Sequence, residues 1–106
     1  MLTSTYLLRT IEGVNLEVRL TDLARKQLDR MPEHIHRKYE YWLDLISYLG
    51  LFEVRKYKGF HDEALKGERF GQRSVRLSKS YRLIYKEQKY GTFLGIEILE
   101  VNKHDY

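Results

Sequence analysis

Apolar and polar residues alternate along residues 14–20, in the run Val-Asn-Leu-Glu-Val-Arg-Leu. A period of two residues is typical of a β-strand that buries one face. Thr21 or Asp22 then offers a side chain that can cap the first turn of a helix, and we expect this helix to continue to about Met31. Pro32 ends it and is compatible with the first turn of a second helix.

The second helix is predicted from about Glu33 to Leu49, and Gly50 stands where a C-terminal cap is expected. Its large apolar residues recur every three or four positions, which is the spacing of one buried helix face. They are Ile35, Tyr39, Trp42, Leu43, Ile46 and Leu49. Aromatic residues can also stack on nucleobases, but this spacing favours packing in the core.

Residues 52–71 lack a regular period and contain three glycines, which predicts a loop. Three strands are expected after it, at residues 72–77, 81–86 and 93–101. The order strand, two helices, three strands predicts an α+β fold in which two helices pack on one face of a mostly antiparallel sheet. The other face of the sheet would remain open. We interpret residues 1–106 as one domain, with residues 1–13 as an N-terminal extension of unassigned role.

Composition narrows the function classes. Hydrophobic residues make up 42% of the chain, which is typical of a globular protein. Cysteine is absent, so cysteine nucleophiles and cysteine zinc sites are excluded, and a reducing, cytoplasmic location is expected. No apolar run approaches the roughly 20 residues that span a bilayer, so we expect no membrane partner.

Charge is unevenly distributed between the two halves of the chain. Residues 1–54 carry 7 Lys/Arg and 8 Asp/Glu, whereas residues 55–106 carry 12 Lys/Arg and 7 Asp/Glu. A basic cluster of this kind favours a surface that binds a polyanion, because like charges repel unless a partner neutralises them. The candidates for RNA contacts are Lys58, Lys66, Arg69, Arg73, Lys79 and Lys103.

Two arginines in the predicted hairpin are the most informative pair. If residues 78–80 form a three-residue loop, Arg76 lies directly opposite Arg82, and both project from the helix-free face of the sheet. Two guanidinium groups side by side destabilise a sheet unless an anion lies between them, and a phosphate fits that position. The alternative is that each arginine reaches a nearby carboxylate.

Groups that transfer protons are found in the tail and in the loop. His104 and Tyr106 share one strand face at a period of two, and an imidazole exchanges protons near neutral pH. Beside an arginine pair they form a plausible set for RNA cleavage without a metal. His61 and Glu63 offer a further acid or base. Three consecutive residues, 61–63, rarely converge on one ion, so we expect neither a metal nor another cofactor.

Three segments together resemble one protein family. They are the run Leu-Lys-Gly-Glu-Arg-Phe-Gly-Gln-Arg-Ser-Val-Arg-Leu at 65–77, the run Tyr-Arg-Leu-Ile-Tyr at 81–85, and the ending Glu-Val-Asn-Lys-His-Asp-Tyr at 100–106. This combination resembles the RelE/HigB superfamily of toxins from bacterial type II toxin–antitoxin systems. The likeness extends over residues 14–106.

The resemblance implies a ribosome-dependent mRNA endonuclease that is neutralised by a cognate antitoxin, often one with a helix-turn-helix DNA-binding domain. It also implies that Arg82 is a catalytic arginine and that Arg76 contacts the scissile phosphate. His104 and Tyr106 fall in the part of the tail where relatives place such residues. Two alternatives stay open, a non-catalytic module that binds RNA or the ribosome and a basic domain that binds an acidic protein.

Overall fold

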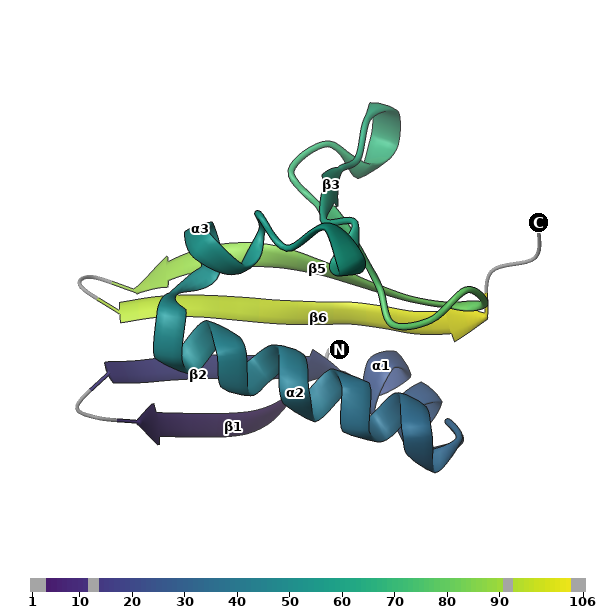
Figure 1. The fold of residues 1–106 in the computed structure, drawn as a ribbon, viewed down its shortest axis with the longest axis horizontal. Helices are drawn as coiled ribbons and strands as arrows, with labels where there is room; N and C mark the ends of the chain where they lie inside the picture. Colours follow the sequence, from purple (N-terminus) through teal and green to yellow (C-terminus); the bar gives the residue numbers. More distant parts are fainter. Residues whose placement is uncertain (1–3, 12–13, 91–92, 104–106) are drawn as a thin grey trace.

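A single sheet of six strands organises the computed structural model, which describes residues 4–11, 14–90 and 93–103 (Figure 1). The strands are β1 (Ser4–Ile11), β2 (Val14–Thr21), β3 (Glu63–Ala64), β4 (Arg73–Arg76), β5 (Tyr81–Tyr90) and β6 (Phe93–Lys103). The helices are α1 (Asp22–Asp29), α2 (Glu33–Leu49) and α3 (Leu51–Val54), with short 3-10 turns η1 (Lys58–Phe60) and η2 (Gly67–Arg69). The strand order is β1-β2-β6-β5-β4-β3. Described neighbours pair antiparallel, except that β2 and β6 are parallel.

The predicted α+β class is confirmed, but the predicted order of elements omits β1, α3 and β3. Residues 4–11, which belong to the extension of unassigned role, form a strand that pairs with β2 in a register that sets Ile11 opposite Val14. The predicted loop at 52–71 contains α3, both 3-10 turns and the two-residue strand β3. These elements are too short to show a period in the sequence.

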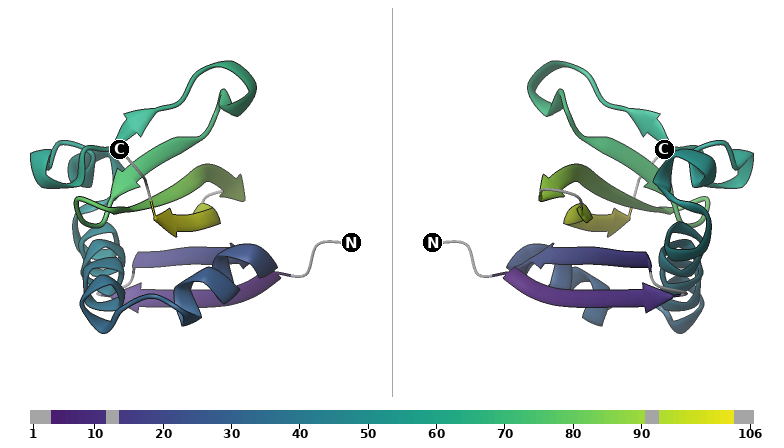
Figure 2. Two further views of the ribbon diagram at one scale, coloured as in Figure 1. Left: turned by 90° about the vertical axis from the view of Figure 1, so that its right-hand side faces the viewer. Right: turned by 90° about the vertical axis from the view of Figure 1, so that its left-hand side faces the viewer.

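One face of the sheet is buried under α2 (Figure 2). Leu16 and Val18 of β2 and Ile98 of β6 project from this face into the core, as the alternating pattern predicts. Trp42 of α2 is fully buried and packs edge-on against Tyr85 of β5, with ring centroids 5.2 Å apart. An aromatic pair of this geometry adds about 1 kcal/mol beyond the burial of its surface.

A bulge in β6 reverses which residues face the core. Ile84 pairs with Glu100 while Tyr85 pairs with Ile98, so Leu99 is the extra residue. Before the bulge Ile98 faces the core, and after it Val101 does.

The N-cap residue of α1, Thr21, and a residue within the helix, Gln27, satisfy the backbone groups that the bulge disturbs. Thr21 caps α1 by accepting a hydrogen bond from the Ala24 amide at 3.0 Å. Its hydroxyl also donates to the Leu99 carbonyl at 2.7 Å. The amide of Val101 donates to the side-chain oxygen of Gln27 at 2.7 Å. Thr21, before the first turn of α1, and Gln27, in its last turn, therefore hold the bulged part of β6 in place.

Candidate active site

The helix-free side of the sheet carries a concentrated set of polar side chains, which we call the arginine face. Residues directly opposite each other across strands share one face, so the pairing registers define its members. They are Glu63, Ser74, Arg76, Arg82, Ile84, Glu100 and Asn102. Four strands, β3 to β6, contribute to this surface, and two of its residues come from β6 only because the bulge turns them outward.

Arg76 of β4 lies directly opposite Arg82 of β5, as the sequence predicts. A hydrogen bond from the Leu77 amide to the Tyr81 carbonyl, at 2.9 Å, closes the turn that sets this register. Val75 and Leu83, on either side of the pair, are fully buried in the core, which directs both arginines to the opposite face. Both arginines are half-buried. This arrangement concentrates two positive charges on a surface without a covering helix.

Glu100 also lies on the arginine face, and its carboxylate is held by two neighbouring side chains. Arg69, in the η2 turn, donates to Oε2 of Glu100 at 2.9 Å. Asn102 donates to Oε1 at 2.7 Å. Sequence reasoning missed both Glu100 and Asn102, since only the bulge places them on the arginine face.

Glu63 is the carboxylate that the structure leaves exposed on the arginine face. It pairs with Ser74, which pairs in turn with Ile84, so Glu63 is two strands and two residues away from Arg82. Strand spacings of about 4.8 Å and about 3.4 Å per residue put their Cα atoms roughly 12 Å apart. A glutamate and an arginine can both reach a phosphodiester placed between them across that distance.

The other predicted residues are distributed more widely. Lys58, Lys66 and Lys79 are exposed in turns. Lys103 pairs with Tyr81, so strand alternation puts it on the side of the sheet opposite the arginine face. His61 is exposed in the left-handed turn after η1, with φ of 46°. His104 and Tyr106 lie outside the described residues.

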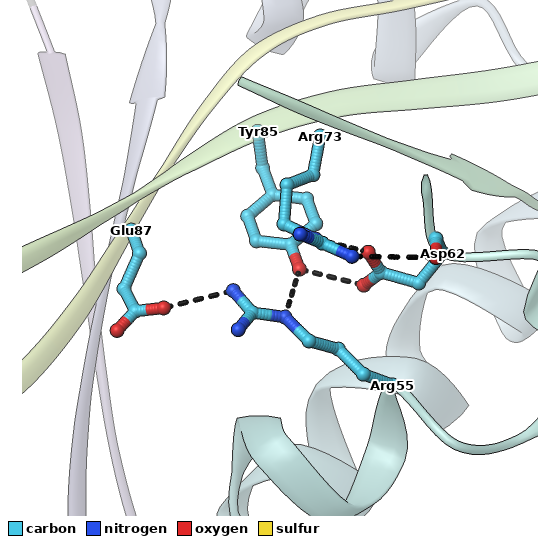
Figure 3. Close-up of polar contacts among 5 residues, drawn as sticks. All are labelled: Arg55, Asp62, Arg73, Tyr85 and Glu87. Carbon is cyan, nitrogen blue, oxygen red and sulfur yellow. Dashed lines mark hydrogen bonds and ion pairs between the residues drawn. The ribbon is translucent and has the colours of Figure 1, made fainter. Parts of the chain in front are cut away.

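Arg73 lies on the helix side of the sheet and takes part in a polar cluster with Asp62 (Figure 3). Its Nε donates to Asp62 Oδ1, and the Tyr85 hydroxyl donates to Oδ2 at 2.6 Å. Arg55 donates to the Tyr85 hydroxyl at 3.4 Å and to Glu87 at 2.8 Å. The structure therefore places Arg73, a predicted RNA contact, on the opposite side of the sheet from Arg76 and Arg82.

The Asp62 cluster fixes the segment that leads into Glu63. The Asp62 side chain is only 1% exposed, and its charge is met by Arg73. Burial, and then the negative charge of Asp62, raises the pKa of the Tyr85 hydroxyl above its usual value, so Tyr85 stays a hydrogen-bond donor. Asp62 precedes β3 and points to the helix side, and Glu63, the first residue of β3, faces the opposite side through its pairing with Ser74.

The described part of the chain has neither a group of metal ligands nor a helix that could span a membrane. Within it, no three His, Asp or Glu side chains are grouped as metal ligands. Residues 61–63 diverge, since His61 is exposed at a turn, Asp62 is buried and Glu63 is on the sheet's open face. None of the described helices is long and apolar enough to cross a membrane.

Comparison with solved structures identifies the architecture. The YoeB/ParE toxin from Agrobacterium tumefaciens superposes with a TM-score of 0.61 at 19% sequence identity, covering 83% of this chain and 98% of that one. A chain of the E. coli DinJ–YafQ toxin–antitoxin complex gives 0.62 at 18% identity, covering 82% and 90%. This protein has the RelE/YoeB toxin fold.

A third structure with this fold comes from the RelBE2 toxin–antitoxin complex of Mycobacterium tuberculosis, with a TM-score of 0.53 at 24% identity, covering 82% of this chain and 95% of that one. No protein-family model and no curated protein matches the sequence. The predicted RelE/HigB resemblance is thus confirmed at the level of the fold, while the narrower HigB assignment stays a prediction.

Proposed function

We propose that this protein is the toxin of a type II toxin–antitoxin system and that it cleaves mRNA on the ribosome, in the cytoplasm, without a metal. The observation that carries the proposal is the position of Arg76 directly opposite Arg82 on the helix-free face. A phosphodiester is the group that two adjacent guanidinium groups bind best. The fold supports the same conclusion, because the similar chains include toxins from the DinJ–YafQ and RelBE2 complexes.

The proposed reaction uses the ribose 2′-hydroxyl as the nucleophile. A base removes its proton, the 2′-oxygen attacks the adjacent phosphorus, and the 5′-oxygen leaves as it receives a proton. The products are a 2′,3′-cyclic phosphate and a 5′-hydroxyl. Arg76 and Arg82 stabilise the extra negative charge on the phosphorane, a role that is worth roughly 3–4 kcal/mol for a single well-placed donor.

Glu63 is our candidate for the base. It is exposed on the same face as the arginines, whereas His61 precedes it at a turn outside the strand register. His104 and Tyr106 stay the candidates for the acid that protonates the leaving oxygen. A cognate antitoxin is the expected partner, and the antitoxin's helix-turn-helix domain stays a prediction from the resemblance.

Inducible expression in a bacterium tests this function. We expect the wild-type protein and the control Arg37→Ala to arrest growth, since Arg37 is exposed on α2 and pairs only with Glu33 in the described contacts. Arg82→Ala and Arg76→Ala should abolish the arrest. Primer extension on a translated mRNA should show cuts that disappear when translation is blocked.

Growth arrest without mRNA cuts would instead favour the non-catalytic module that binds RNA or the ribosome. Arrest by Arg82→Ala as strong as that of the wild type, with the same cuts, would contradict the nuclease.

A further inference from the structure

Phe70 is the most exposed large hydrophobic residue in the described part of the chain, at 85%. It directly follows η2, in the turn between β3 and β4. An isolated apolar ring in water gains nothing for the fold, because its surface is not removed from solvent. The ring therefore contributes little to stability and is open to contact with a partner.

The turn that carries Phe70 is well defined by its backbone. The Phe70 amide donates to the Gly67 carbonyl at 3.1 Å, and the Gln72 amide donates to the Arg69 carbonyl at 2.9 Å. Gly67 and Gly71 have φ of 67° and 93°, a region that favours glycine. The ring thus projects from an ordered turn.

Arg69 ties this turn to the arginine face. Its guanidinium donates to Gln72 at 2.9 Å and to Glu100 of β6 at 2.9 Å. Glu100 pairs with Ile84, two residues from Arg82 on β5. The turn between β3 and β4 lies at the β3 edge of the sheet (Figure 2). Phe70 directly follows Arg69 in this turn, and the contact of Arg69 with Glu100 puts it next to the arginine face.

We propose that Phe70 stacks on a nucleobase of the mRNA next to the phosphate that Arg76 and Arg82 bind. This inference rests on the proposed function and adds a positioning residue to it. A splayed-out base offers a flat π-surface, and aromatic side chains bind such surfaces in single-stranded RNA. A phenyl ring has no hydrogen-bonding group, so the stacking holds the base in place without selecting its identity.

The surroundings of Phe70 favour RNA over a protein partner. A protein-binding patch is a continuous apolar area made of several side chains. The turn around Phe70 instead carries Lys66, Glu68 and Arg69. An aromatic ring interleaved with basic residues is the pattern of a single-strand binding surface.

Four variants separate stacking from a general apolar effect. Phe70→Leu keeps apolar bulk without a π-surface, and Phe70→Ala removes both. Phe70→Trp retains and enlarges the π-surface. Phe52→Leu is the matched control, since Phe52 is 69% exposed on α3, on the helix side. Cleavage of a reporter mRNA is measured in a reconstituted translation reaction with the full-length variants.

We expect kcat/KM to fall about ten- to a hundredfold for Phe70→Ala and Phe70→Leu, which matches the cost of losing one stacked base. Phe70→Trp should stay within about threefold of the wild type, and Phe52→Leu should be unchanged. Thermal midpoints should agree for all variants, because neither ring is buried.

A second readout reports stacking without cleavage. Programmed ribosomes carry an mRNA with 2-aminopurine in the codon that contains the mapped cut and a 2′-deoxy sugar at that cut. We expect wild type and Phe70→Trp to quench its fluorescence and Phe70→Leu to quench it at least threefold less.

Cleavage by Phe70→Leu at the wild-type rate overturns the stacking role while leaving the nuclease intact. If that variant also loses affinity for the antitoxin, Phe70 belongs to a protein interface. No cleavage by the wild type contradicts the proposed function, and equal quenching by all variants then removes the stacking proposal as well.

Discussion

Replacing Asp62 with asparagine tests the cluster that fixes the approach to Glu63. The carboxylate is 1% exposed and accepts hydrogen bonds from Arg73 and Tyr85. Breaking a fully buried ion pair costs about 3–5 kcal/mol. Arg73 is 26% exposed, so water recovers part of that loss and we expect about 2–3 kcal/mol. At about 4 °C per kcal/mol for a chain of this size, the midpoint of thermal unfolding should fall by about 8–12 °C.

A double-mutant cycle assigns this loss to the contact between Asp62 and Tyr85. Tyr85→Phe removes one hydrogen bond to a charged acceptor, and we expect it to cost about 1.5 kcal/mol. Because the two residues share that bond, the double variant should be at least about 1 kcal/mol more stable than the sum of the single losses implies. Urea unfolding followed by circular dichroism provides all four free energies of unfolding.

The matched control is Asp29→Asn on α1. Its side chain is 67% exposed and lies 3.8 Å from Arg25, so the change should cost less than about 0.5 kcal/mol. An Asp62→Asn variant as stable as this control, or strict additivity with Tyr85→Phe, would refute the anchoring role of the cluster.

Three further predictions concern stability. Above about pH 10 tyrosine ionises in the unfolded chain while folded Tyr85 keeps its proton, so the wild type should lose free energy of unfolding, by up to about 1.4 kcal/mol per pH unit relative to Tyr85→Phe. Urea titrations at several pH values measure this, and parallel curves for the two proteins would contradict the raised pKa of Tyr85. Thr21→Val removes both the cap of α1 and the bond to Leu99, and its urea midpoint should reflect a loss of about 1–2 kcal/mol at constant m. Gly71 has a φ of 93°, where an alanine is strained, so Gly71→Ala should lower the thermal midpoint by the equivalent of about 1–3 kcal/mol. Gly59→Ala should not lower it, and equal effects of the two changes would refute backbone strain at Gly71.

Local patterns account for the parts of the fold that the sequence predicts well. The period of two in β2 and the helical spacing in α2 each depend on one buried face, which the sequence shows directly. The opposition of Arg76 and Arg82 follows from a short turn and strand parity, so it too was predictable.

The parts that were missed depend on contacts between distant residues. Ser4–Ile11 has no clean alternation, and its identity as a strand follows from pairing with β2. A sequence signal did exist, namely a two-residue segment, Glu12-Gly13, between two runs with apolar residues. The parallel pairing of β2 with β6 depends on side chains that are distant in the chain.

The bulge explains why two residues of the candidate site, Glu100 and Asn102, were not predicted. Simple alternation from Ile98 would put Glu100 and Asn102 in the core. Leu99 interrupts the period, and Thr21, 78 positions earlier, stabilises the interruption. The ion pair of Arg73 was not foreseen either, since its partner Asp62 lies in a segment without a period.

The most direct test of the nuclease is the fate of a single ribose oxygen. Primer extension first maps the cut in a ribosome-bound mRNA, and the same mRNA is then synthesised with a 2′-deoxy sugar on the 5′ side of the scissile phosphate. We predict that the wild type cleaves only the all-ribose mRNA and leaves a 2′,3′-cyclic phosphate and a 5′-hydroxyl. Cleavage of the 2′-deoxy mRNA at the same position, or a 5′-phosphate on the product, would contradict attack by the 2′-hydroxyl between Arg76 and Arg82.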